Sequence, residues 1–127
     1  MADEITLTIP REPDFHRVAY LVLGGLAVRM NLTVENLEDL QIALDSILDR
    51  LELDSGEITV RMALRDGALE TRIGPLATKL LDEIERERGQ ALSLRRVLES
   101  TVDDVHVDGE WVSLTKKVSV GGESAGG

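Results

Sequence analysis

The sequence predicts an α+β fold, a two-layer sandwich in which helices cover one face of a mixed, mostly antiparallel sheet. Two observations lead to this prediction. Two pairs of strand-like segments are each joined by an Asp-Gly turn, at Asp66-Gly67 and Asp108-Gly109, and such turns are typical of antiparallel hairpins. The segments with helical periodicity come in two groups of two, not one after each strand. A doubly wound parallel sheet, in which strands and helices alternate, is therefore not expected.

The chain is expected to begin with a strand and a long helix. Residues 5–9 alternate between apolar and polar side chains, which is the pattern of a half-buried strand. Apolar residues recur at helical spacing over residues 14–30, and Asn31 is expected to end this helix in the left-handed conformation. The pair Gly24-Gly25 lowers helix propensity, so we interpret it as allowing close packing against another element.

A second amphipathic helix is expected to follow directly. Thr33 is the predicted N-cap, and acidic residues fill the first turns, where the helix dipole favours negative charge. Its apolar stripe extends from Leu37 to Leu51.

The second half of the chain is expected to contain two hairpins separated by two helices. The predicted strands are residues 58–65, 69–73, 105–107 and 111–114, and the predicted helices are residues 77–88 and 92–101. We expect residues 1–118 to form a single domain. Residues 119–127 are rich in glycine and are expected to be a disordered tail.

Composition excludes several classes of function. The 127 residues carry a net charge of −10, which disfavours binding to nucleic acid or to an anionic membrane surface. There is no cysteine, and the two histidines are not at metal-ligand spacing, so neither a thiol nor a metal site is expected. The N-terminal residues lack the features of a signal peptide, so a cytoplasmic location is expected.

The order of these elements resembles that of RsbW-like anti-sigma regulatory factors, which are serine kinases of the GHKL superfamily with a Bergerat-type (histidine kinase-like) ATPase fold. The resemblance extends over nearly the whole chain apart from the tail. It is carried by the strand that ends at Pro10, the helix that closes at Asn31, the segment Asp-Leu-Gln-Ile-Ala-Leu at residues 39–44, and the closing hairpin at residues 109–116. The resemblance implies an ATP-dependent kinase scaffold in a bacterial regulator of transcription, with a sigma factor or an anti-anti-sigma (STAS-type) protein as its partner.

The resemblance also identifies the positions at which the family keeps its catalytic residues. On the second helix the family has a Glu that activates the attacking hydroxyl and, four residues later, an Asn that binds Mg²⁺. Alignment on Leu40 and Ala43 places these roles at Ser46 and Arg50. A serine is no general base at neutral pH, and the fixed positive charge of an arginine repels Mg²⁺. Both positions are therefore interpreted as degenerate.

Asp45 and Asp49 have the same spacing of four residues and form an alternative acidic pair. They are displaced by one position, which corresponds to a rotation of about 100° around the helix axis. One interpretation is a shifted Mg²⁺-binding pair; the other, which we prefer, is a solvated helix face.

The nucleotide-binding motifs implied by the resemblance are degraded as well. The family's Asp-x-Gly-x-Gly, whose Asp accepts a hydrogen bond from adenine, is replaced by a segment without Asp in which Pro75 removes a backbone donor. The phosphate-binding glycine loop is reduced to Gly89 followed by Gln and Ala91. The nearby arginines could hold an anion, but pairing with neighbouring glutamates is the preferred interpretation; these are Arg86, Arg88, Arg95 and Arg96.

These observations together predict a regulatory, protein-binding domain with no cofactor, no bound metal and no catalytic residues of its own. The sequence does not decide whether the chain is an enzyme, but the degraded motifs favour a protein without enzymatic activity. The alternative is an active serine/threonine kinase that uses Asp45 and Asp49. A homodimer is a further possibility. We expect the cleft between the second helix and the sheet to be blocked by Arg50, Leu76 and the helix that follows.

Two further residues have open interpretations. His16 is expected to be a partly exposed helix residue because no Ser/Asp arrangement points to a triad. Trp111, on the last hairpin, is interpreted as either an anchor in a protein interface or a plug in the core.

Overall fold

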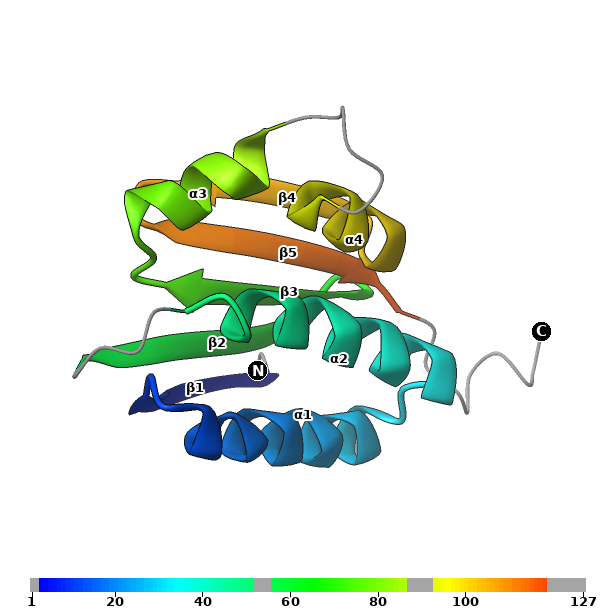
Figure 1. Ribbon diagram of the computed structural model, residues 1–127. Coiled ribbons are helices and arrows are strands. Elements are labelled where there is room, and N and C mark those ends of the chain that lie inside the picture. The colour runs from blue at the N-terminus through cyan, green and yellow to red at the C-terminus, as the bar shows by residue number, and fades with distance from the viewer. Residues whose placement is uncertain (1–2, 52–55, 87–92, 119–127) are drawn as a thin grey trace.

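The computed structural model describes residues 3–51, 56–86 and 93–118, which form a five-stranded sheet with helices on one side (Figure 1). The strands are β1 (Asp3–Pro10), β2 (Glu57–Arg65), β3 (Ala68–Gly74), β4 (Asp104–Asp108) and β5 (Trp111–Lys117). The helices are α1 (His16–Met30), α2 (Val34–Leu48), α3 (Thr78–Glu85) and α4 (Leu94–Thr101), with the short 3-10 helix η1 (Pro13–Phe15) before α1.

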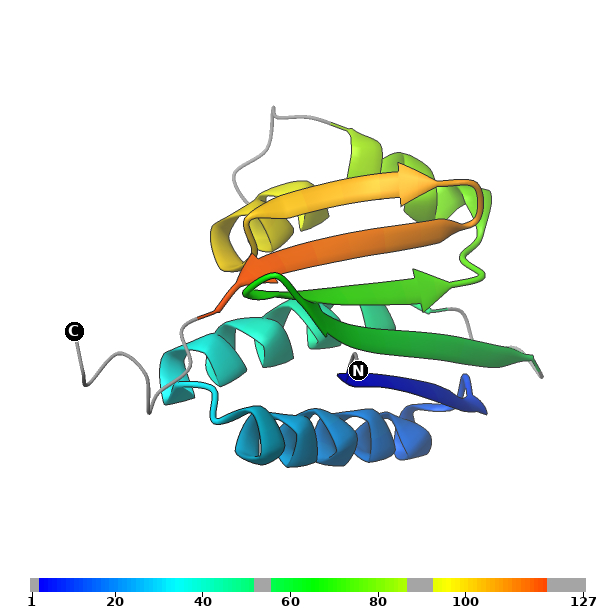
Figure 2. The ribbon, with the colours of Figure 1, turned by 180° about the vertical axis from the view of Figure 1, so that it is seen from behind.

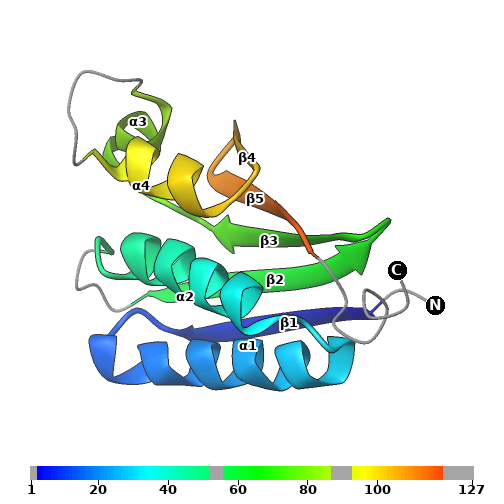
Figure 3. The same ribbon diagram turned by 90° about the vertical axis from the view of Figure 1, so that its right-hand side faces the viewer.

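The sheet has the order β1-β2-β3-β5-β4, and every neighbouring pair of described strands is antiparallel. The four α-helices lie on the same face, as Figures 1 and 3 show from two directions. Figure 2 shows the opposite face, which no described helix covers. The predicted α+β, two-layer fold is confirmed, but the described strands pair only antiparallel and do not form the mixed sheet that was expected. The expected tail, residues 119–127, lies outside the described residues.

The hairpin between β2 and β3 forms where its turn residues require it. Asp66 and Gly67 both have positive φ values, of 50° and 76°, as a tight two-residue turn demands. Leu64 is then paired with Leu69, and both side chains point to the helical layer. The predicted hairpin is therefore confirmed, and its turn fixes the register between β2 and β3.

Local capping sets the boundary between α1 and α2. Asn31 adopts the left-handed conformation, with φ 56°, and ends α1 as predicted. The hydroxyl oxygen of Thr33 accepts a hydrogen bond from the backbone N–H of Asn36 over 3.1 Å, so Thr33 is the N-cap of α2. The two helices consequently run antiparallel and side by side across β1 and β2 (Figures 1 and 3).

The core lies between the sheet and the helices and is built almost entirely from aliphatic side chains. Its largest fully buried members include Leu23 and Leu26 of α1, Leu44 and Ile47 of α2, and Met62 of β2. An ion pair at the edge of this core joins the two layers: Lys116 Nζ of β5 lies 2.9 Å from Asp39 Oδ2 of α2. Among the described residues, no helix has the length and apolar character that crossing a bilayer requires.

The interpretation of Gly24-Gly25 is wrong. A Cβ atom built on either glycine would meet nothing within 4 Å, so no described element of this chain packs closely there. Both residues lie on the outer side of α1, because the positions that face the sheet are taken by Ala19, Leu23 and Leu26.

The expectation for His16 is also wrong. Its side chain is buried, with 7% exposure, and Nε2 has no hydrogen-bond partner among the described residues. His16 precedes Ala19 and Leu23 by three and seven positions, so it shares their side of the helix and turns inward.

Candidate functional site

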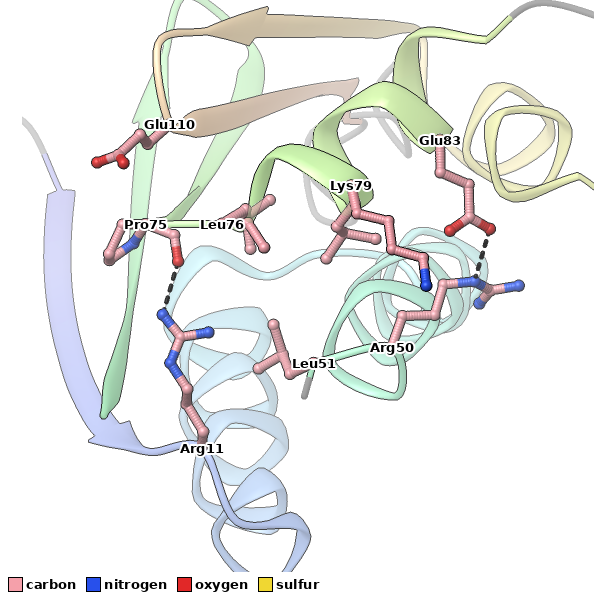
Figure 4. Close-up of a pocket in the computed structure, with 10 residues that line it drawn as sticks. Arg11, Arg50, Leu51, Pro75, Leu76, Lys79, Glu83 and Glu110 are labelled. Atoms are coloured by element: carbon pink, nitrogen blue, oxygen red, sulfur yellow. Dashed lines mark hydrogen bonds and ion pairs between the residues drawn. The ribbon is translucent and has the colours of Figure 1, made fainter. Parts of the chain in front are cut away.

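A pocket of about 440 Å³ opens between the end of α2 and the start of α3 (Figure 4). We call it the α2–α3 pocket. It is lined by Arg11, Arg50, Leu51, Pro75, Leu76, Ala77, Lys79, Leu80, Glu83 and Glu110. These residues come from the ends of β1 and α2, from the linker between β3 and α3, from α3 itself and from the β4–β5 turn. Sequence segments far apart in the chain therefore meet at this point.

The expectation that this cleft is blocked is wrong. Arg50, Leu76 and helix α3 do form part of its wall, as expected, but the side chains line the space without filling it. Leu76 is buried, with 3% exposure, and points into the core, which leaves the volume in front of it open.

Two hydrogen bonds hold the linker between β3 and α3 against the rest of the pocket. Arg11 Nη2 donates to the carbonyl oxygen of Pro75 over 2.7 Å, and the backbone N–H of Leu76 donates to the carbonyl oxygen of Glu110 over 2.7 Å. Arg11 follows β1 directly, and Glu110 belongs to the β4–β5 turn. The linker is therefore hydrogen-bonded to segments from both edges of the sheet. Pro75 is exposed at the pocket wall.

Arg50 extends from the end of α2 toward α3. Its Nη1 donates to the carbonyl oxygen of Ser46 over 2.9 Å, and its Nε lies 3.4 Å from Glu83 Oε2. Both charged side chains are more than a third exposed, so the ion pair contributes at most about 1 kcal/mol to stability. The ion pair holds the Arg50 side chain against α3, at one side of the pocket that both residues line.

Ser46 does not line the pocket. Its hydroxyl donates to the carbonyl oxygen of Ile42 over 2.7 Å, within the same helix. This is a common local arrangement for a serine inside a helix. This hydrogen bond orients the Ser46 hydroxyl along α2 and not toward the α2–α3 pocket.

The charges around the pocket suit an anionic group better than a cation. Three positive side chains line it, from Arg11, Arg50 and Lys79, against the two carboxylates of Glu83 and Glu110. In the part of the chain that the structure describes, no group of three or more His, Cys, Asp or Glu side chains is arranged to hold a metal ion. The described lining also contains no pairing of a nucleophile with a base.

Asp45 belongs to a different surface. It accepts a short hydrogen bond from the hydroxyl of Tyr20 on α1 and lines a hollow between α1 and α2. Asp49 caps the end of α2 and is exposed. The structure therefore turns Asp45 toward α1 and away from the α2–α3 pocket.

Burial and the hydrogen bond to Asp45 raise the pKa of Tyr20, and the negative charges of Asp45 and Asp49 add to this effect. Because its pKa is above the ordinary value of 10.0, the folded state holds the phenolic proton to higher pH than the unfolded chain does. The resulting contribution to stability is present below pH 10 and is lost as pH rises through the raised pKa.

We expect Tyr20→Phe to lower the free energy of unfolding by about 1 kcal/mol at neutral pH, because Asp45 loses its hydrogen-bond donor. Urea unfolding at a series of pH values measures this. The gap between the two proteins should narrow above pH 10, since only the natural chain has a tyrosine to ionise. A constant gap up to strongly alkaline pH would contradict the assigned cause of the pKa shift.

The remaining predicted positions have mixed outcomes. Gly89, Ala91 and Arg88 lie outside the described residues. Arg95 Nε lies 2.8 Å from Glu99 Oε2, so the preferred interpretation, pairing with a neighbouring glutamate, is confirmed for this arginine. Arg86 is exposed at the end of α3.

Sequence reasoning missed Arg11, Lys79 and Glu110 as pocket residues. Arg11 follows the proline that ends β1, and Glu110 sits in an Asp-Gly-Glu turn, so both are read first as exposed loop residues. No spacing along the chain connects either of them to α3. A prediction of the full strand order would have been needed to bring them together.

Comparison with known proteins gives one consistent family name. The chain is 28% identical over 141 aligned positions to the serine-protein kinase RsbW of Listeria monocytogenes, covering 94% of this chain and 90% of that protein. It is 26% identical to RsbW of Oceanobacillus iheyensis, covering 86% and 81%. No protein-family model matches the chain.

Part of a solved structure, that of the RsbU and RsbW domains of a Mycobacterium tuberculosis protein, has the same fold. Its TM-score is 0.64 at 16% identity, and the match covers 93% of this chain and 32% of that one. The resemblance to RsbW-like proteins that the sequence suggested is thus confirmed, and the chain shares its fold with the matched part of this solved structure.

Proposed function

We propose that this chain, which is similar to RsbW serine-protein kinases over most of its length, regulates a protein partner by binding it and neither binds ATP nor transfers phosphate. The partner would be a sigma factor or a STAS-type protein, as for an anti-sigma factor. Residues 1–118 would form the single domain that carries this function, with residues 119–127 as a tail. A homodimer is compatible with this role.

The observation that carries the proposal is the position of Arg50. Arg50 lines the α2–α3 pocket, and the resemblance assigns the family's Mg²⁺-binding Asn to this residue. A fixed positive charge opposes a divalent cation in a site with few carboxylates, and ATP bound without Mg²⁺ loses the bridge between its phosphates and the protein. Ser46, at the position of the general base, has its hydroxyl bonded to Ile42.

The surroundings of Asp45 count against the alternative, an active kinase that uses Asp45 and Asp49. Asp45 is bonded to Tyr20 and lines the hollow between α1 and α2, on another side of α2 from the pocket. A Mg²⁺ ion held there would lie away from the space that Pro75 and Leu76 border. This supports a binding role in preference to the alternative.

Isothermal titration calorimetry with Mg-ATP is the decisive experiment. We expect no saturable heat, which corresponds to a Kd weaker than about 1 mM. The RsbW of Listeria monocytogenes, named as a serine-protein kinase, is the positive control. Micromolar binding that disappears in Asp49→Ala would overturn the proposal in favour of the alternative, and micromolar binding unaffected by that substitution would overturn its claim about the pocket.

The protein-binding half of the proposal has a separate test. Sigma factors and STAS-type proteins of the source organism, purified one at a time, should include one that binds the chain in the absence of nucleotide. If none binds by calorimetry or size-exclusion chromatography, the partner class is wrong.

A further inference from the structure

The outer surface of α1 and α2 exposes large apolar side chains. These are Leu21 (75% exposed) and Val28 (83%) on α1, and Val34 (70%) and Ile42 (48%) on α2. The two helices lie side by side and form the layer farthest from the open sheet face (Figures 1 and 3). Exposed apolar side chains gathered on one surface of a soluble domain are typical of an interaction site.

On α1 the apolar residues form a ridge with a gap in it. Leu21 and Val28 are seven positions apart and therefore point to the same side of the helix. Gly24 and Gly25 lie between them, and the space above both glycines is open. Another helix can approach the α1 backbone closely at this point, with Leu21 and Val28 on either side of it.

Between the two helices lies a hollow of about 500 Å³, which we call the α1–α2 groove. It is lined by Tyr20, Glu38, Gln41, Ile42 and Asp45. The ring of Tyr20 and the side chain of Ile42 give it an apolar part, and two carboxylates give it negative charge. No Lys or Arg is among these lining residues.

The negative charge continues along α2. Glu35, Glu38, Asp45 and Asp49 are spaced at intervals of three, seven and four residues with Ile42 among them, so all five side chains share the outward side of the helix. Helix α2 itself contains no Lys or Arg, and the cations of α1 are Arg17 and Arg29.

This charge pattern selects among the occupants that could cover the surface. A second copy of the chain, itself carrying a net charge of −10, would bring two acidic rows together, and like charges at an interface oppose association. A helix with an apolar stripe flanked by Lys and Arg would instead pair its cations with Glu38 and Asp45. Its apolar residues would cover Leu21, Val28 and Ile42.

We propose that the α1–α2 groove and the adjoining ridge of Leu21 and Val28 bind a cationic amphipathic helix of a partner protein. The inference rests on the protein-binding function proposed above and assigns a surface and a partner chemistry to it. Binding is of the helix-in-groove kind, in which apolar anchors at helical spacing give affinity and the flanking charges fix orientation.

The test uses the full chain and three labelled peptides of about five helical turns. The first has Leu at positions that form one stripe and Lys beside the stripe. The second replaces each Leu with Ser, and the third replaces each Lys with Glu. We expect fluorescence anisotropy to give micromolar binding for the first peptide and binding at least about tenfold weaker for the other two.

Variants of the chain locate the contact. Val28→Ser and Glu38→Lys should each weaken the first peptide by about tenfold, since one removes an apolar anchor and the other reverses a charge. Glu85→Lys is the matched control: it makes the same charge change on exposed α3 and should alter binding by less than about twofold. All three positions are exposed, so the variants should fold.

Three results would overturn the inference. The first is that the first peptide does not bind. The second is that Glu38→Lys and Glu85→Lys weaken its binding equally, which would mean unspecific attraction to an acidic chain. The third is that light scattering finds a dimer that Val28→Ser dissociates, in which case a second copy of the chain covers this surface. Because these measurements involve neither ATP nor a sigma or STAS protein, their failure is distinguishable from failure of the proposed function.

Discussion

Replacing Ile84 with Ala should lower the free energy of unfolding by about 2–5 kcal/mol. Ile84 has no exposed surface, and the shorter side chain would leave a cavity beneath α3 that its neighbours can close only in part. The carbonyl oxygen of Ile84 also accepts a hydrogen bond from Arg95 Nη1 of α4 over 3.2 Å, so the two helices hold each other at this point. Urea unfolding monitored by circular dichroism gives the change as a lower midpoint with an unchanged slope.

The control for this substitution is Lys79→Ala on the same helix. Lys79 is exposed, and its replacement should change stability by less than about 0.5 kcal/mol. If Ile84→Ala were equally neutral, α3 would not be packed on the core in solution, and the wall of the α2–α3 pocket would be free to move.

The packing of α3 bears on the proposed loss of nucleotide binding. The resemblance to RsbW-like kinases implies that a lid closing over ATP would lie in this stretch of the chain. Here Leu80, Leu81 and Ile84 are buried on one side of α3. Any movement of α3 that resembles a lid would expose these three side chains to water, at about 1.5–3 kcal/mol for each. A fixed helix is consistent with a domain that binds a protein without a nucleotide cycle.

Elements whose geometry is decided by neighbouring residues could be predicted from the sequence. The left-handed Asn31, the N-cap Thr33 and the Asp66-Gly67 turn are each set by a backbone preference that acts over a few positions. With these fixed, alternation within the strands decides which side chains meet the helices, and the antiparallel sheet follows.

Features that depend on contacts between distant segments could not be predicted in this way. Whether His16 faces the sheet or solvent depends on how α1 is rotated against β1 and β2, and a helix with apolar residues on several sides does not reveal this rotation. The open pocket is a similar case. Arg11 and Glu110 reach it only through the strand order, for which no local pattern exists.

The position of Trp111 could be predicted from the sequence only in part. Alternation along β5 correctly separates it from the buried residues Val112 and Leu114, so the interpretation as a core plug is wrong. It lies half-buried on the open sheet face instead, with the guanidinium carbons of Arg61 and Arg72 at 5.9 and 5.6 Å from its ring centre. Its other interpretation, an interface anchor, stays a prediction.

The small residue beneath Trp111 leads to the second large effect. We expect Gly74→Ala to destabilise the chain by about 1–3 kcal/mol. In most strand positions this substitution would be neutral or favourable, because alanine restricts the unfolded chain more than glycine does, by about 0.4–1 kcal/mol. Here, however, a Cβ on Gly74 would lie 2.5 Å from Cδ2 and 2.8 Å from Cε3 of the indole, so the ring must leave its place.

A double-mutant cycle separates the clash from any other effect of the added methyl group. In a Trp111→Leu background the clash with the indole is gone, and Gly74→Ala should become neutral or slightly stabilising, which gives a coupling of at least about 1 kcal/mol. The chain has a single tryptophan, so displacement of the indole into water should also shift the fluorescence of the Gly74→Ala protein to longer wavelength. Equal destabilisation in both backgrounds would mean that strand β3 itself, and not Trp111, requires the glycine. Destabilisation that occurs only when Trp111 is present, together with the spectral shift of the Gly74→Ala protein, would instead establish that Gly74 is small because an aromatic ring between two arginines occupies the space above it.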